Sequence, residues 1–299
     1  MAGASAPAGA EPRRRRLAEQ MKFRFLGTGT SVGVPQIGCG CRVCTSADPR
    51  DRRRRCGAYA VADSGEAFLV DTPPELRLAC IEYGISRVDA VVLTHAHMDH
   101  VAGFDDVRRF NTINGVKVPV DGDDPRYRGL KYRVVGKPLP CYALDETIAQ
   151  MHAIFPYISA KGGEMGLYRP QIEFRGNSAP FSIGGIELEA VRVEHGFPCC
   201  GYVMRERGAS LAYISDCHAI SEEGLARLRG LDVLVLNCLR EREHPTHLSL
   251  ARCLEYIGRI APRKAYIVHM CHDLTHEDWL KRLSGTVAEP AWDGLEIEL

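Results

Sequence analysis

Several features that would assign the chain to a particular class are missing from its 299 residues. Its 38 lysines and arginines balance 38 aspartates and glutamates, and this neutrality argues against a protein whose whole surface binds nucleic acid. No apolar run approaches the roughly 20 residues that a helix needs to cross a bilayer, so we expect no membrane span. The sequence has no internal repeat and no obvious linker between domains. What remains is an ordinary globular composition, long enough to bury a core.

The neutral total conceals an uneven charge distribution. Residues 1–55 contain twelve Lys or Arg and four Asp or Glu, a balance of +8, so residues 56–299 sum to −8. Two arginine runs, Arg13–Arg16 and Arg52–Arg55, provide much of the excess. Such runs are either solvated surface or a means of attracting anions, and both interpretations stay open at this point.

The N-terminus and the cysteines bear on the cellular compartment. Residues 1–20 are predicted to be a disordered extension, followed by one folded domain over residues 21–299. The extension lacks the apolar segment of a secretion signal. We therefore expect a cytoplasmic protein whose twelve cysteines are free thiols or metal ligands.

Short strand patterns alternate with helical patterns throughout the domain. Strands are predicted at residues 22–26, 58–62, 67–70, 88–93, 139–142, 186–193, 211–214, 233–236, 265–268 and 295–299. Helices are predicted at 75–83, 144–155, 221–228, 249–260 and 275–283, with Asp145 and Ser249 as N-caps. The stretch 156–180 is rich in Gly and Pro and is predicted to be a long surface loop or lid. This mixture predicts an α/β fold in which helices cover sheets.

The strongest chemical signal is the segment His95-Ala96-His97-Met98-Asp99-His100. It follows an apolar run and should therefore lie at the C-terminal end of a strand. Packing does not readily explain four side chains able to bind metal within six residues. Alternation places His95 and His97 on one side of an extended turn, whereas Asp99 and His100 can face a neighbouring point. This arrangement favours two metal ions close together.

Three further candidate ligands each follow an apolar strand pattern: His195, Asp216 and His269. Sites in α/β sheets gather at the carboxyl ends of strands, so these loops can converge. We predict one metal bound by His95, His97 and His195, a second bound by Asp99, His100 and His269, and Asp216 bridging both. Nitrogen and oxygen ligands suit Zn²⁺, Mn²⁺ or iron. Asp71 either orients a ligand histidine or is a turn residue before Pro73.

A second candidate metal site is the cysteine segment of Cys39, Cys41 and Cys44. Thiolates at this spacing in a loop with glycine can wrap one tetrahedral Zn²⁺. His272 is the best fourth ligand, with Cys271 or Cys56 as alternatives. A closed site of this kind is structural, because no position remains open for water. The competing interpretation is a redox pair or three unrelated cysteines.

Together these residues resemble the metallo-β-lactamase fold superfamily, whose hallmark is HxHxDH, and within it the PhnP-like phosphodiesterases. That group includes phosphoribosyl 1,2-cyclic phosphate phosphodiesterase. The resemblance runs from Met21 to Leu299 and also rests on residues 26–30, residues 38–44, Ser215, Asp216, His247, His269, His272 and residues 293–295. It implies an α/β fold of the αββα type, a four-layer sandwich of two mixed β-sheets flanked by helices, with residues 21–299 as the hydrolase domain.

The resemblance also implies roles for individual histidines. It implies that His272 completes the structural zinc site with the three cysteines. It places His247 near a scissile phosphate, where a histidine can donate a proton to the leaving alkoxide. A surface-loop histidine is the alternative for His247. The remaining candidates without such support, which we read as structural or exposed, are His152, His218, His244 and His276.

The implied function is hydrolysis of a small phosphodiester, a cyclic phosphate such as a phosphoribosyl 1,2-cyclic phosphate. It would use two catalytic Zn²⁺ or Mn²⁺ ions, one structural Zn²⁺, and Asp99 and His247 as catalytic residues. Arg108 and Arg109 either steady a phosphate or form a solvated helix face. The 94 residues between His100 and His195 exceed those of shorter members, and segments 122–136 and 156–180 would frame the pocket.

Two other functions compete with this one. A tRNA 3′-end ribonuclease has the same fold but needs a basic surface or arm, and residues beyond 55 are acidic, so nucleic acid is disfavoured as a partner. A non-hydrolytic carrier similar to the PqqB-like proteins would have a degenerate ligand set, and here the set is complete. The family resemblance is compatible with a homodimer.

Overall fold

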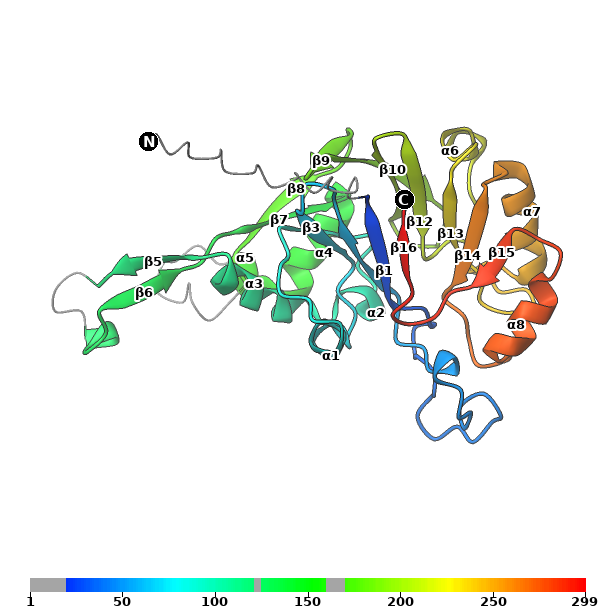
Figure 1. Ribbon diagram of the computed structural model, residues 1–299, viewed down its shortest axis with the longest axis horizontal. Helices are drawn as coiled ribbons and strands as arrows, with labels where there is room; N and C mark the ends of the chain where they lie inside the picture. Colours follow the sequence, from blue (N-terminus) through cyan, green and yellow to red (C-terminus); the bar gives the residue numbers. More distant parts are fainter. Residues whose placement is uncertain (1–19, 121–124, 160–169) are drawn as a thin grey trace, which may run out of the picture.

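The computed structural model describes residues 20–120, 125–159 and 170–299 (Figure 1). Nearly all of the predicted N-terminal extension, and residues 160–169 of the predicted lid, therefore lie outside the described residues. None of the helices within the described ranges is long and apolar enough to cross a bilayer.

The first of two large sheets gathers strands from both ends of the chain. Its members are β1 (Lys22–Gly27), β2 (Gly57–Val61), β3 (Ala67–Val70), β4 (Ala90–Val92), β7 (Leu139–Ala143), β8 (Ile172–Gly176) and β16 (Glu296–Glu298). Their spatial order is β16-β1-β2-β3-β4-β7-β8. Pairing is antiparallel from β16 to β3 and parallel from β3 to β8.

The second sheet has the same mixed character. Its members are β9 (Phe181–Ile183), β10 (Ile186–Val193), β11 (Cys199–Glu206), β12 (Ala209–Ile214), β13 (Val233–Asn237), β14 (Lys264–Val268) and β15 (Ala288–Pro290). Their spatial order is β15-β14-β13-β12-β11-β10-β9, with antiparallel pairing from β9 to β12 and parallel pairing from β12 to β15. A separate antiparallel hairpin consists of β5 (Val116–Pro119) and β6 (Tyr132–Val135).

Helices lie on the outer faces of the two large sheets (Figure 1). The α-helices are α1 (Leu76–Glu82), α2 (Met98–Val101), α3 (Arg108–Ile113), α4 (Asp145–Ile154), α5 (Pro156–Ser159), α6 (Glu222–Arg227), α7 (Leu250–Ile260) and α8 (His276–Leu283). Three short 3₁₀ helices are η1 (Pro49–Asp51), η2 (Phe104–Val107) and η3 (Pro125–Tyr127).

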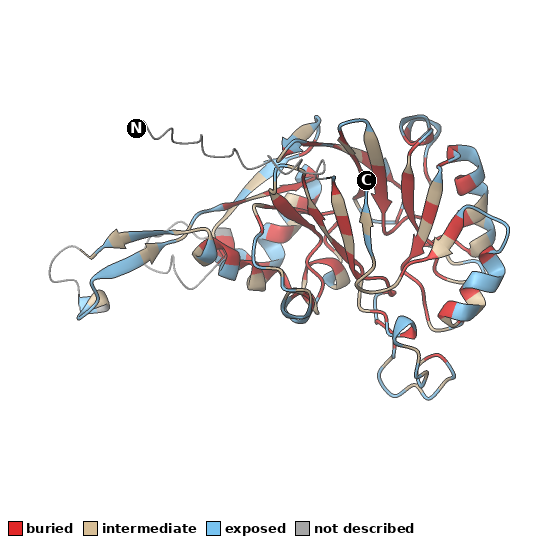
Figure 2. Ribbon diagram, in the orientation of Figure 1, coloured by how far each residue is buried: buried red, intermediate tan, exposed pale blue. Residues whose placement is uncertain are grey.

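Three buried apolar clusters fill the spaces between the layers, as Figure 2 shows by the buried colouring of the central strands. Phe23 and Phe25 alternate with Arg24 along β1, so both rings point between the sheets toward residues such as Tyr213. A second cluster lies between the first sheet and helices such as α1 and α4, and a third between the second sheet and α6–α8. The predicted αββα sandwich is therefore confirmed.

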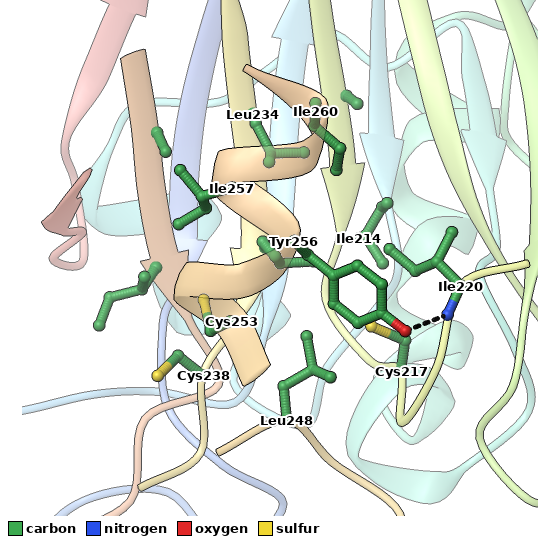
Figure 3. Close-up of a cluster of buried hydrophobic side chains, with 14 of the residues drawn as sticks. Ile214, Cys217, Ile220, Leu234, Cys238, Leu248, Cys253, Tyr256, Ile257 and Ile260 are labelled. Atoms are coloured by element: carbon green, nitrogen blue, oxygen red, sulfur yellow. Dashed lines mark hydrogen bonds between the residues drawn. The ribbon is translucent and has the colours of Figure 1, made fainter. Parts of the chain in front are cut away.

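Helix α7 shows how the sequence produces one of these layers. Its buried residues Cys253, Tyr256, Ile257 and Ile260 follow the i, i+3, i+4, i+7 spacing of an amphipathic helix. Figure 3 shows this face packed over the second sheet. The Tyr256 hydroxyl accepts a hydrogen bond from the Ile220 amide at 3.0 Å, so the polar end of this buried side chain is satisfied.

One predicted cap and one predicted loop are wrong, and a second predicted cap is confirmed in position only. Asp145 is the first residue of α4 rather than its N-cap, where its charge still favours the helix N-terminus. Ser249 is the N-cap of α7 by position, but its hydroxyl donates to Glu243 instead of accepting from the helix. The stretch 156–180 contains α5 and the edge strand β8, because Ile172 and Phe174 pack beside the first apolar layer.

Candidate metal centres

The HxHxDH segment leaves the carboxyl end of β4 as expected. His97 is the N-cap residue of α2, which places Asp99 and His100 in the first turn of that helix. His95 and His100 are fully buried, whereas His97 is partly exposed. The Thr94 carbonyl accepts a hydrogen bond from the Cys200 amide at 3.0 Å, so the segment is tied to β11 of the other sheet.

A first group of imidazoles comes from both sheets. His95 Nε2 lies 3.0 Å from His97 Nδ1, and His195 Nε2, from the loop after β10, lies 3.2 Å from the same nitrogen. Ligand nitrogens around one tetrahedral zinc ion lie about 3.3 Å apart, given bonds of about 2.0–2.1 Å. These three nitrogens are thus spaced as ligands of one ion would be.

A second group contains Asp99, His100 and His269, whose ligand atoms all lie within 4.8 Å of one another. The Asp216 carboxylate lies beside this group: its Oδ2 is 3.0 Å from His100 Nε2, and its Oδ1 is 3.0 Å from His269 Nε2. The same Oδ1 is 3.8 Å from His195 Nε2 of the first group. Asp216 therefore faces both groups, which is the position that a bridging carboxylate requires.

The charges and the unpaired atoms of this cluster fit divalent cations. Among the described residues, His100 Nε2, His269 Nε2 and Asp216 Oδ2 are buried and form no well-aligned hydrogen bond, although they lie close to one another. Burial alone lowers the pKa of His269, but Asp216 and Asp99 outweigh it and raise this pKa to about 9. The two carboxylates thus favour positive charge between them, and imidazole with carboxylate is a donor set for Zn²⁺ or Mn²⁺.

Neighbouring polar groups orient the candidate ligands. Asp71 Oδ2 lies 2.7 Å from His100 Nδ1, and Thr94 donates to the Asp71 carboxylate from both its amide and its hydroxyl at 2.8 Å. His195 Nδ1 donates to the Thr246 carbonyl at 2.9 Å. These contacts direct the opposite ring nitrogens toward the centre of the cluster. Of the two readings of Asp71, the structure supports the orienting one.

Two of these residues have an uncommon backbone conformation. Asp71 has φ 61° and His269 has φ 60°, in the left-handed region that residues other than glycine rarely adopt. Such conformations cost on the order of 1–3 kcal/mol and persist where the surrounding structure imposes them. Here the buried contacts of Asp71 and His269 impose them at the candidate metal centre.

His247 lies against this cluster rather than on the surface. It is 8% exposed, and its ring stacks on that of His269 with centroids 4.5 Å apart. Its Nδ1 is 3.6 Å from Asp216 Oδ1. Burial and the neighbouring His269 lower the pKa of His247 to about 2. His244, interpreted from the sequence as structural or exposed, lies beside His247, with the two ring centroids 5.1 Å apart.

The cysteine segment forms a separate cluster with His272. The sulfur atoms of Cys39, Cys41 and Cys44 each lie 3.4 Å from His272 Nδ1. A tetrahedral zinc ion with bonds of about 2.3 Å to sulfur and 2.0–2.1 Å to nitrogen places these atoms about 3.5 Å apart. A hydrogen bond from the Cys44 amide is the largest factor that lowers the pKa of Cys41 to about 6, which favours a thiolate there.

The alternative ligands for the cysteine cluster are not part of it. The Cys56 thiol is buried and donates to the Gly29 carbonyl. The Cys271 thiol is not among the grouped ligand atoms, and its backbone carbonyl accepts a hydrogen bond from Arg53. Arg108 and Arg109 do not lie among the candidate ligands either. Arg108 forms an ion pair with Asp105, and Arg109 lines a groove beside α1.

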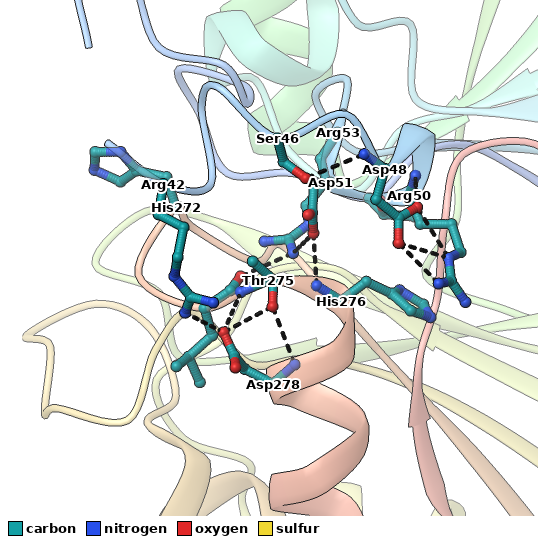
Figure 4. Close-up of polar contacts among 12 residues, drawn as sticks. Arg42, Ser46, Asp48, Arg50, Asp51, Arg53, His272, Thr275, His276 and Asp278 are labelled. Atoms are coloured by element: carbon teal, nitrogen blue, oxygen red, sulfur yellow. Dashed lines mark hydrogen bonds and ion pairs between the residues drawn. The ribbon is translucent and has the colours of Figure 1, made fainter. Parts of the chain in front are cut away.

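The run Arg52–Arg55 is largely built into the structure, so the solvated-loop interpretation is wrong for most of it. Arg53 is fully buried beside Asp51 (Figure 4), and it donates to the Cys271 and Leu274 carbonyls at 2.6 and 2.9 Å. Arg54 and Arg55 form ion pairs with glutamates of the α1 region. Arg53 therefore fixes the loop that carries His272 and directly follows His269.

Helix α8 supports the same loop from the other side. Thr275 and Asp278 form a capping box at its N-terminus, and the Asp278 carboxylate also pairs with Arg42 of the cysteine segment (Figure 4). This contact connects the cysteine segment to α8 independently of any ion.

Comparison with known proteins agrees with this geometry. The beta-lactamase superfamily domain matches residues 61–270. A crystal structure described as a new diphosphatase of the PhnP family superposes with a TM-score of 0.78, at 34% sequence identity, over 94% of this chain and 97% of that one.

Two further relatives have names that do not refer to a phosphodiesterase. The octanoyltransferase of Porphyromonas gingivalis is 30% identical over 282 residues, covering 92% of this chain. The chain spans only 51% of the length of that relative. Coenzyme PQQ synthesis protein B of Methylorubrum populi is 27% identical over 235 residues, covering 73% of this chain and 72% of that protein.

Proposed function

The chain belongs to the metallo-β-lactamase fold superfamily as a PhnP-like member, and we propose that it hydrolyses a phosphodiester, most simply a small cyclic phosphate. The family and the diphosphatase neighbour support a metal-dependent hydrolase. The observation that carries the finer proposal is the convergence of six imidazole and carboxylate ligands around Asp216, beside the buried ring of His247.

In this proposal two divalent ions are held by two sets of residues. His95, His97 and His195 would hold one, Asp99, His100 and His269 would hold the other, and the Asp216 carboxylate faces both groups. When bound, such a pair would lower the pKa of a shared water to about 7 and would screen the phosphoryl oxygens. Asp71 and Thr94 keep the His100 ring in position, so that the Nε2 atom faces Asp216.

Asp99 and His247 are the chain's own candidates for moving protons. Asp99 lies at the rim of the second group, where its carboxylate can accept a proton from an attacking water. His247 can donate a proton to the leaving alkoxide. Because burial and His269 lower its pKa to about 2, this role requires the negative charge of a bound phosphodiester to raise that pKa.

We also propose that the cysteine cluster holds a structural zinc ion. Four ligands at tetrahedral spacing leave no position for water or substrate. Its place beside the loop that follows His269 makes it a support for the second ligand group. The tetrahedral spacing favours this role over a redox pair.

The test is a panel of phosphodiesters assayed with the metal-loaded protein: bis(p-nitrophenyl) phosphate, a ribose 1,2-cyclic phosphate, cyclic nucleotides and an open dinucleotide. We expect turnover of the cyclic esters with a preference for the ribose compound. Turnover of none of them would contradict the proposal and favour the non-hydrolytic carrier alternative. Preference for the open dinucleotide would favour the ribonuclease alternative.

A further inference from the structure

Phe197 is an exposed aromatic side chain beside the candidate metal centre. All nine phenylalanines of the chain lie within the described ranges, and Phe197 alone among them is exposed, at 44%. Its ring centroid lies 4.8 Å from that of the candidate ligand His97. A phenyl ring in water is stabilised when an apolar surface covers it. The described part of the chain leaves nearly half of this ring uncovered, so it is available to a ligand that reaches the metal centre.

The connection between β10 and β11 fixes the position of this ring. Gly196 directly follows the candidate ligand His195 and has φ 79°, in the left-handed region that glycine tolerates. On the other side of Phe197, Cys200 is buried in β11, and its amide donates to the Thr94 carbonyl at 3.0 Å. A short loop anchored at both ends therefore carries the ring, and its exposure is built into the fold.

Phe197 lies on the open side of the metal centre. Five of the seven candidate ligands are buried. By contrast, His97 is partly exposed, and the Asp99 side chain is 11% exposed. Solvent therefore reaches the centre past these two residues, and the Phe197 ring lies against the first of them. A ligand that approaches the centre from solvent passes this ring.

A polar side chain from another loop lies close to the same opening. His247 stacks on His269 with centroids 4.5 Å apart. Its loop lies beside the turn that precedes the exposed ring, because a Cβ added at Gly196 would lie 3.8 Å from Thr246 Cγ2. The centre thus offers an aromatic surface beside His97 and an imidazole beside His269. A furanose fits such a site, since its ring face carries C–H groups and its edge carries oxygens.

We propose that Phe197 is the specificity-determining residue that recognises the sugar ring of the substrate, by packing against the C–H face of a furanose. This role rests on the proposed hydrolysis of a cyclic phosphate, and it adds that the cyclic ester is fused to a sugar. A partner protein fits less well, because a protein that covered Phe197 would also cover His97 and Asp99. Burial of roughly 50 Å² of apolar surface in this contact corresponds to an affinity gain of about tenfold.

The test compares two cyclic phosphates that have the same five-membered reacting ring. Ribose 1,2-cyclic phosphate carries a furanose, whereas ethylene phosphate carries no sugar. For the ribose compound we expect Phe197→Ala to raise KM about tenfold with little change in kcat, because substrate and transition state make the contact equally. Phe197→Tyr keeps the ring and should stay within about twofold of the wild type. On ethylene phosphate both variants should stay within about twofold of the wild type, because no sugar face is present.

A binding measurement separates this role from the proposed hydrolysis. Calorimetry with the metal-loaded protein compares ribose 1-phosphate with 2-hydroxyethyl phosphate, which are monoesters with and without the sugar. The wild type should prefer ribose 1-phosphate by about tenfold or more, and Phe197→Ala should lower this preference about tenfold. The matched control is Leu280→Ala, which removes an apolar side chain that is 39% exposed on α8, and it should behave as the wild type does.

The possible results distinguish the two proposals. Equal losses on both cyclic esters, or loss of a metal ion from Phe197→Ala, would overturn the recognition role and show that Phe197 only positions His97. An unchanged preference of Phe197→Ala for ribose 1-phosphate would also overturn it. Turnover of neither ester, with a preference for ribose 1-phosphate that depends on Phe197, would contradict the proposed hydrolysis and still support recognition of the sugar.

Discussion

The histidine–aspartate cluster and the cysteine cluster lie three residues apart where they share a loop, at His269 and His272, yet they are built in opposite ways. The first is buried, takes ligands from the ends of four strands in two sheets, and leaves Asp216 facing two groups of imidazoles. The second is half-buried, comes mainly from one short loop, and brings each sulfur to the same 3.4 Å from one imidazole nitrogen.

This difference in construction predicts a catalytic role for the histidine–aspartate cluster and a structural role for the cysteine cluster. A closed tetrahedral set leaves no coordination position for a substrate, whereas two adjacent groups that share a carboxylate can leave a position between them. Both clusters depend on the loop after β14, which Arg53 fixes by donating hydrogen bonds to the carbonyls of Cys271 and Leu274. The following predictions test whether the two clusters really have separate roles.

The largest effect is expected from Asp216→Ala. Removal of the carboxylate that faces both groups should empty at least one catalytic metal position and lower turnover by about 10³-fold or more. Zinc in the cysteine cluster should remain. Metal analysis together with phosphodiester turnover measures both, and retained activity with both catalytic ions bound would contradict the bridging role.

His247→Ala should have the next largest effect, about 10²-fold on kcat, provided that the ester has an alkoxide leaving group. Hydrolysis of bis(p-nitrophenyl) phosphate should change little, because nitrophenolate leaves without a proton. Metal content should equal that of the wild type. If both substrates are affected alike, or if an ion is lost, His247 acts as a ligand rather than as a proton donor.

Cys39→Ala should mainly affect stability. We expect loss of one zinc ion per chain and a melting temperature lower by roughly 5 °C or more, because structural zinc contributes directly to folding. The kcat should fall less than tenfold at a temperature where the variant is folded. Cys80→Ala, outside the cluster, is the control, and a loss of turnover comparable to that of Asp216→Ala would show that the clusters do not have separate roles.

The smallest effect concerns the contact between the cysteine segment and α8. Hydrogen bonding from Thr275, together with Arg42, lowers the pKa of Asp278 to about 2, below its unfolded value of about 3.9. Asp278 therefore stabilises the fold above about pH 4, and this contribution is lost as pH falls from about 4 to 2. Asp278→Ala should cost about 1 kcal/mol of unfolding free energy at pH 7.

The measurement for Asp278→Ala is denaturant unfolding between pH 2 and 7, with the exposed neighbour Glu277→Ala as control. The difference between Asp278→Ala and the wild type should shrink below about pH 4. A constant difference across that range would show that the carboxylate charge has no part in the cap.

The fold was predictable where local pattern and burial agree. Alternation along β1 and along β10 gave their bounds closely, since each strand buries one face. The strand β11 was missed because all but one of its residues are buried, which leaves no alternation to detect. The strand β8 was missed because Gly and Pro surround it and its pairing partner β7 lies about 30 residues earlier.

The candidate site was predictable for a different reason. Closely spaced ligands such as His95 and His97 can be recognised in the sequence alone. The ends of strands in α/β sheets lie close together because of the topology, so the more distant ligands could be placed near them. The contact of His244 with His247 could not be predicted, because it depends on how the loop between β13 and α7 folds.

The separate roles of the two clusters are tested most directly by the metal content of the purified wild-type protein, measured alongside hydrolysis of bis(p-nitrophenyl) phosphate before and after mild chelation. We expect three divalent ions per chain, loss of two with loss of turnover on chelation, and recovery of turnover when Zn²⁺ or Mn²⁺ is restored. A single tightly held zinc ion without turnover under any metal supplement would contradict those roles.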